Sequence, residues 1–136
     1  MNLPDPVPGL VIRFGYTWHK DRFRKDRPCA IVLTSQESGL VTVVPITHSY
    51  PEVGEEDQSI LIPEDICKAI GLDQEANYVR VSEINQFVWP SDRLAPLPHD
   101  QTRCDYGMVP ESFFLEIRKK LAAIARAKRM KALKVD

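Results

Sequence analysis

Eleven prolines divide this 136-residue chain into short apolar runs. Proline lacks a backbone N–H and has a fixed φ, so it interrupts helices and is confined to the ends, edges or bulges of strands. The segments between the prolines are rich in valine, isoleucine and aromatic residues, which favour strands. A chain punctuated in this way is expected to form several short strands and few long helices.

The apolar runs predict six strands, at residues 9–16, 28–34, 40–47, 59–62, 78–84 and 86–89. The second and third runs flank a turn signal at 36–39 and predict an antiparallel hairpin. Pro45 lies inside the third run and belongs at a strand end, an edge or a bulge. Polar or proline-rich stretches predict loops at residues 17–26, 50–58 and 93–102.

The sequence also predicts two helices. Residues 63–70 begin with a proline and two acids and end before Gly71, which suits a short helix. After Pro110, apolar residues recur at three- and four-residue steps and form one face of a longer helix, made by Phe114, Ile117, Leu121 and Ile124. Because most strands precede this helix, the predicted fold class is mainly β with a C-terminal α-helix packed on a small β-barrel.

The length predicts one domain over residues 1–136, with a core over 8–125 and a basic C-terminal tail over 126–136. The composition is 43% hydrophobic and 27% charged, as in globular proteins. No apolar run reaches the roughly 18 residues of a membrane helix, and the N-terminus lacks the pattern of a signal peptide. Three cysteines without CxxC spacing favour a cytoplasmic protein without disulfides.

Basic residues are concentrated in two places, although the net charge is −1. Residues 111–136 carry eight Lys or Arg against three Asp or Glu, and residues 20–27 carry five against two. This asymmetry allows a polyanionic partner such as a nucleic acid. A solvated helix face and a charged loop explain the same pattern.

Standard catalytic signatures are absent from the sequence, including the P-loop, GxGxxG, GxSxG and HExxH. His19, His48 and His99 are far apart and have no carboxylate at metal-ligand spacing, so no metal site is predicted. Cys29 and Cys67 lie in apolar segments and are expected to be small core residues rather than nucleophiles.

Polar residues stand at the open end of the predicted hairpin. Arg27 directly precedes the first strand, and Thr47, His48 and Ser49 end or follow the second. In a hairpin joined near Gly39, residues 27 and 47 are about equally distant from the turn and fall at the same end. A guanidinium suits phosphate, and a hydroxyl beside it can hold a phosphate oxygen. The alternative is a solvated arginine and a threonine that caps a turn.

A second polar set follows on the 78–84 run. Strand alternation sends Arg80 and Ser82 to one face, and Glu83 comes directly after them. This arginine is expected either at a rim of the barrel or in a surface cross-strand pair.

Several blocks of this sequence resemble the MazF/PemK (Kid) family of toxins. The blocks, with the family pattern in parentheses, are PGLV at 8–11 (GDIVWV), RPCAIVLT at 27–34 (RPAVVLS), VVPITHS at 43–49 (VVPITS) and VRVSEI at 79–84 followed by RL at 93–94 (VRCDQ…RL). The helix after Pro110 is similar to the family's terminal helix. The resemblance spans residues 8–125.

The resemblance implies an SH3-like β-barrel that forms homodimers and cleaves single-stranded RNA without a metal or another cofactor. In that family the arginine of the RP block and the threonine of the PIT block are the catalytic pair, which here are Arg27 and Thr47. The arginine of the VRCDQ block, a proposed acid in some members, corresponds to Arg80. The interface of the homodimer is expected to include the strand and loop after Ile46.

The chain departs from the family at the acid that follows this arginine, which is a proposed base. Ser82 takes its place, and because serine is not a general base, Glu83 or a histidine would have to serve. A first-loop histidine of some members corresponds to His19.

Cleavage by a ribose 2′-hydroxyl needs a base, an acid and cationic stabilisation of the phosphate. The predicted RNA-binding residues beside the catalytic three are His19, Arg22, Arg24, Lys25, His48, Ser49, Ser82 and Glu83. Bases could stack on Trp18, Phe23 or Trp89.

The leading functional hypothesis is the toxin of a type II toxin–antitoxin pair, acting as a sequence-selective endoribonuclease. Its expected partners are single-stranded RNA, a second copy of the chain and an acidic, partly disordered antitoxin. The antitoxin is expected to contact the loop cations Lys20, Arg22, Arg24 and Lys25. Two alternatives are a non-catalytic toxin related to CcdB, which poisons gyrase, and a stand-alone nucleic-acid-binding barrel. The pair Arg27 and Thr47 favours the enzyme, whereas Ser82 favours the alternatives.

Overall fold

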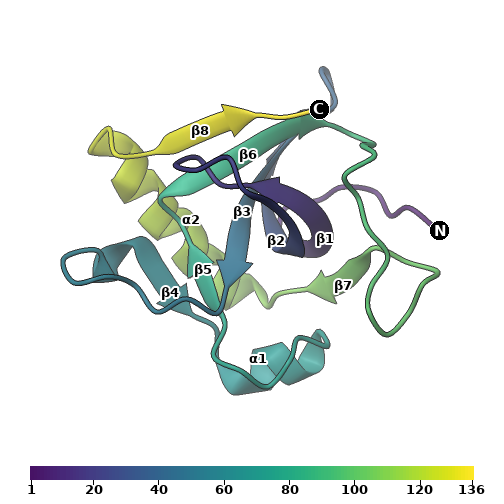
Figure 1. The fold of residues 1–136 in the computed structure, drawn as a ribbon, viewed down its shortest axis with the longest axis horizontal. Coiled ribbons are helices and arrows are strands. Elements are labelled where there is room, and N and C mark those ends of the chain that lie inside the picture. The colour runs from purple at the N-terminus through teal and green to yellow at the C-terminus, as the bar shows by residue number, and fades with distance from the viewer.

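A computed structural model covers residues 1–136 and has a mainly antiparallel sheet of eight strands with one long helix near the C-terminus (Figure 1). The strands are β1 (Leu10–Thr17), β2 (Arg24–Thr34), β3 (Leu40–Thr47), β4 (Ser59–Leu61), β5 (Tyr78–Arg80), β6 (Glu83–Val88), β7 (Asp105–Met108) and β8 (Lys131–Lys134). The helices are α1 (Glu64–Ala69), α2 (Glu111–Arg126) and the 3₁₀ turn η1 (Glu56–Gln58). The mainly β class and the C-terminal helix are therefore confirmed.

Strand pairing gives the order β4-β5-β3-β2-β1-β7, with β6 added to β3 and β8 added to β6. Every pair is antiparallel except β6 with β8, which is parallel. The sheet curls, but its strands do not close into a complete barrel.

The central strand β3 explains how a proline fits inside a sheet. Residues Leu40–Val43 of β3 pair with β6, whereas Ile46 and Thr47 pair with β5. Pro45 lies between these two ladders, where its missing N–H interrupts neither of them. The sequence prediction that Pro45 lies at a strand end, an edge or a bulge is therefore wrong: Pro45 lies inside the central strand, opposite Cys29 of β2, at the point where β3 changes its other partner from β6 to β5.

The hairpin of β2 and β3 has the predicted antiparallel form. Gly39 in its turn has a φ of 74°, a left-handed conformation that glycine adopts at little cost. Cys29 pairs with Pro45. Continuing that register by two residues brings Arg27 opposite Thr47, so the two residues do lie at the same end of the hairpin.

Two hydrophobic clusters pack on opposite sides of the sheet, because side chains alternate along each strand. On β3, Val44 and Ile46 belong to the cluster that α1 and α2 cover, while Val41 and Val43 belong to the other. The predicted helical stripe is confirmed by Ile117 and Ile124, which are buried, and by Phe114 and Leu121, which pack against the same cluster. No helix of this protein is long and apolar enough to cross a membrane.

Several predicted boundaries are wrong. The loop at 17–26 is shorter than predicted, because residues 24–26 extend β2 and pair with residues 15–17 of β1. The division predicted inside 78–89 falls at residues 81–82 instead of at 85. Both β7 and β8 are additional strands. β8 lies beside β6 (Figure 1), so part of the predicted basic tail belongs to the sheet.

Candidate functional site

Arg27 is a half-buried cation without an anionic partner in the protein. Its guanidinium carbon lies 4.8 Å from the centre of the Trp18 ring, over the ring face. No carboxylate forms an ion pair with Arg27. Its Nε is the only buried side-chain nitrogen or oxygen in the protein that has no hydrogen-bond partner. Burial lowers the pKa of this guanidinium below its usual value, which shows that desolvation outweighs the attraction of neighbouring groups.

Thr47 is the last residue of β3, and its side chain is almost fully buried. Its Oγ1 accepts a hydrogen bond of 3.1 Å from the backbone N–H of Ser49. This contact is the turn-capping arrangement that the sequence allowed as an alternative role. The hydroxyl still has a proton to donate, so the capping contact does not prevent it from contacting a ligand.

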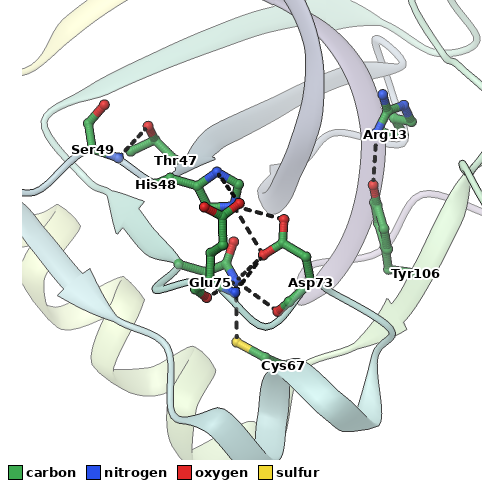
Figure 2. A network of polar contacts seen from close by, with 9 residues as sticks. Arg13, Thr47, His48, Ser49, Cys67, Asp73, Glu75 and Tyr106 are labelled. Atoms are coloured by element: carbon green, nitrogen blue, oxygen red, sulfur yellow. Dashed lines mark hydrogen bonds and ion pairs between the residues drawn. The ribbon is translucent and has the colours of Figure 1, made fainter.

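Arg27 and Thr47 line one cavity of about 370 Å³, which we call the Arg27 pocket. Three cations border it: Arg13, Lys25 and Arg27. The other polar side chains in its lining are Asp26, Thr47, His48, Asp73, Asn77, His99 and Tyr106. Arg13 is held by a hydrogen bond of 3.3 Å from its Nη1 to the hydroxyl of Tyr106 (Figure 2). The pocket is therefore polar and bordered mainly by positive charge, as a site for an anionic ligand requires.

The predicted residues of the 78–84 region lie in a second hollow, of about 660 Å³, which we call the Arg80 hollow. Its lining comprises Trp18, Lys20, Asp21, Phe23, Ser49, Tyr50, Glu52, Glu55, Gln58, Arg80, Ser82, Glu83 and Lys131. Arg80 donates a hydrogen bond of 2.9 Å from Nε to Ser59 Oγ, so this arginine, unlike Arg27, has a partner. The resemblance grouped Arg80 with Arg27 and Thr47 as catalytic residues. In the structure, Arg80 lines a different hollow from these two residues.

The two hollows adjoin at the end of β3. Thr47 lines the Arg27 pocket, and Ser49, whose N–H bonds to Thr47, lines the Arg80 hollow. Trp18 also lines the Arg80 hollow and carries the Arg27 guanidinium on its face. An extended ligand that follows this junction would therefore meet Arg27 between the two hollows.

Glu83 is a buried carboxylate held by two donors. Its Oε1 accepts hydrogen bonds from the Tyr16 hydroxyl at 2.9 Å and from the backbone N–H of His19 at 3.2 Å. Burial, followed by the charge of Glu83, raises the pKa of Tyr16 far above its usual value, so this tyrosine stays protonated. The charge of Glu83 also acts on Arg27. Glu83 thus acts on Arg27 through its charge without forming an ion pair with it, whereas His19 contributes only its backbone N–H.

The loop cations do not gather on one surface. Lys25 borders the Arg27 pocket and Lys20 the Arg80 hollow, while Arg22 sits at the hairpin tip with a φ of 59°. Arg24 is exposed on β2. The sequence analysis treated these four cations as one cluster. In the structure, residues 24–26 belong to β2, and Lys25 and Lys20 line different hollows.

His48 belongs to a group that the sequence did not predict. Its Nε2 lies 2.9 Å from Asp73 Oδ2, and its Nδ1 lies 3.5 Å from Glu75 Oε2 (Figure 2). The two carboxylates come from the segment between α1 and β5, far from His48 in the sequence. Sequence spacing therefore gave no signal for this contact, which only the tertiary fold creates.

Comparison of the chain with models of known protein families and with curated proteins finds no match.

Proposed function

We propose that this protein is a metal-independent endoribonuclease, the toxin of a type II toxin–antitoxin pair, with a MazF/PemK-like architecture related to the SH3-like barrel. The observation that carries the proposal is the unpartnered Nε of Arg27 in a cavity shared with Thr47. A buried polar group without a partner is unfavourable and needs an explanation, and a ligand that supplies the missing contact is the explanation proposed here. A guanidinium pairs best with phosphate or carboxylate.

In the proposed reaction, the ribose 2′-hydroxyl attacks the adjacent phosphorus and the 5′-oxygen leaves. Arg27 stabilises the negative charge that builds on the phosphate oxygens, which is the role of a fixed cation in a site of low dielectric constant. The Thr47 hydroxyl donates a hydrogen bond to one of these oxygens. The products are a 2′,3′-cyclic phosphate and a 5′-hydroxyl, and the leaving 5′-oxygen takes its proton from solvent water.

We assign acceptance of the 2′-hydroxyl proton to Glu83. Ser82 stands where the family has its proposed base, and a serine cannot take that role. Hydrogen bonds from Tyr16 and the His19 backbone fix the Glu83 carboxylate through one oxygen. Arg80, in the same hollow as Glu83, then contributes positive charge for RNA binding. Bases flanking the cut stack on the aromatic side chains of that hollow, Trp18, Phe23 and Tyr50.

The proposed partners follow from the same groups. Single-stranded RNA binds across the junction of the two hollows, and an acidic antitoxin segment competes for it by charge. A homodimer is proposed through the strand and loop after Ile46, and the site of action is the cytoplasm.

The main alternative is a nucleic-acid-binding protein without catalysis. Its support is the partnered Arg80, which lies in a different hollow from Thr47. A gyrase-directed toxin has no comparable support from the site.

Cleavage of a long single-stranded RNA in EDTA tests the proposal. The wild-type protein should release fragments with 2′,3′-cyclic phosphate ends, and Arg27→Ala and Thr47→Ala should each reduce the rate by about 10²-fold or more. Arg118→Ala, on an exposed position of α2, is the matched control and should cleave at the wild-type rate. Binding of RNA without any cleavage would favour the alternative.

A further inference from the structure

Two separate parts of the chain bring potential metal ligands together at the rim of the Arg27 pocket. His48 follows Thr47 at the end of β3, whereas Asp73 and Glu75 belong to the segment between α1 and β5. Each offers one ligand atom, and these atoms all lie within 4.8 Å of one another. Figure 2 shows the imidazole and the two carboxylates turned toward one another.

We propose that His48, Asp73 and Glu75 form a binding site for a divalent transition-metal ion of the zinc class. One imidazole nitrogen and two carboxylate oxygens are ligands that zinc accepts, whereas magnesium and calcium prefer oxygen ligands alone. Three protein ligands leave a position for water or another ligand. The proposed RNA cleavage uses no metal, so this site is a separate property of the same pocket.

The spacing of the ligand atoms suits an ion after small side-chain movements. Zinc binds nitrogen and oxygen at about 2.0–2.2 Å, so ligand atoms around it are roughly 3–4 Å apart. The present contacts of His48 are 2.9 Å to Asp73 and 3.5 Å to Glu75, although they use different ring nitrogens. All three side chains are substantially exposed. Coordination through one ring nitrogen requires Glu75 to move toward the nitrogen that faces Asp73, and the exposed Glu75 side chain is free to rotate.

A buried asparagine holds one of the carboxylates in place. Asn77 Nδ2 donates to Asp73 Oδ1 at 3.2 Å and to the Glu75 carbonyl at 2.9 Å. The Glu75 N–H donates to the same Asp73 Oδ1 at 3.2 Å. His48 Nε2 lies 2.9 Å from Asp73 Oδ2 and 3.1 Å from Oδ1, so the carboxylate held by Asn77 faces the imidazole with both oxygens. Partners of this kind orient the ligands of metal sites and raise their affinity.

The cavity beside this cluster also holds the cation on which the proposed function rests. Arg27, which lines the same pocket, has a buried Nε that no protein acceptor satisfies. A metal ion on one wall and a guanidinium on another would hold an oxyanion from two sides.

Titration of the metal-free protein with zinc chloride in a calorimeter tests the site, with cobalt chloride and visible absorption as a second probe of ordered coordination. The wild-type protein should bind one zinc ion and show a rise in melting temperature when zinc is added. His48→Ala should raise the dissociation constant by at least about 10-fold and abolish the rise in melting temperature. Asp73→Asn, which keeps an oxygen for the Asn77 contact, should weaken binding similarly.

His99→Ala is the matched control, because His99 also lines the Arg27 pocket but is not part of the cluster. It should bind zinc as the wild type does. Circular dichroism of the exposed-position variants verifies their folding. The absence of binding at millimolar zinc, or equal affinity in the wild type and His48→Ala, would overturn the proposal. Neither result depends on RNA cleavage, so the metal site and the proposed nuclease fail or succeed separately.

Discussion

Replacement of Arg27 with methionine should lower the free energy of unfolding by no more than about 1 kcal/mol, while it removes the group proposed to bind phosphate. The lost contact is the guanidinium over Trp18, which contributes about 0.5–2 kcal/mol. The apolar stem is largely kept, because methionine replaces most of its buried carbon surface. The substitution also removes the buried Nε that has no hydrogen-bond partner, and with it a desolvation cost of about 1–3 kcal/mol. These terms oppose each other, so the expected net change lies between a loss of about 1 kcal/mol and a gain of about 2.5 kcal/mol in stability.

Urea denaturation measures this change through the midpoint and slope of the unfolding curve. Arg93→Met is the matched control. The Arg93 guanidinium donates to the Gly15 carbonyl at 2.8 Å and to Thr17 Oγ1 at 2.8 Å, and it pairs with Asp136. Losing hydrogen bonds of a charged group costs about 1.5–3 kcal/mol each, so this variant should be clearly less stable.

The comparison of the two arginines separates a ligand-binding group from a structural one. If Arg27→Met destabilised the fold as much as Arg93→Met does, Arg27 would be a structural residue. The inference from its unpartnered Nε would then be wrong.

Three further results are expected. Stability should fall by up to about 1.4 kcal/mol per pH unit as the pH rises above about 10, because the pKa of Tyr16 is raised in the folded state. In urea denaturation, the midpoint of Tyr16→Phe should lack this contribution to the pH dependence. Ile117→Ala should lower the free energy of unfolding by about 2–5 kcal/mol in the same assay, since it opens a cavity between α2 and the sheet. Neutralising Lys20 and Lys25, the loop cations that line the two hollows, should weaken RNA binding and flatten its dependence on salt in a filter-binding assay more than neutralising Arg126 and Lys128 does.

The hairpin of β2 and β3 could be predicted because its residues carry strong local signals. Runs of β-branched residues on both sides of Gly39 define the strands and the turn, and simple counting puts Arg27 opposite Thr47. The helical stripe of α2 is equally local, since Ile117 and Ile124 are spaced by the period of the helix itself.

Strands without an apolar run could not be predicted in the same way. β7 has the sequence DYGM and β8 the sequence KALK, and each forms because a neighbouring strand offers an unpaired edge. The polar extension of β2 at residues 24–26 is likewise specified by its pairing with β1.

Contacts between distant segments set the limit for the candidate site. The sequence suggested that Arg80 would join Arg27 and Thr47, but the pairing of β4 with β5 gives Arg80 a partner in Ser59. The sequence analysis found no carboxylate near His48 in the sequence. Asp73 and Glu75 come close to His48 only because the chain turns back after α1.

The rate of RNA cleavage by the wild type and by Arg27→Met, measured in EDTA on the same single-stranded substrate, tests the proposed nuclease most directly. The proposal expects the wild type to cleave and the variant to be at least about 10²-fold slower, although its stability is at most about 1 kcal/mol below that of the wild type. Equal rates for the two proteins, or an RNA left intact by the wild type, would contradict it.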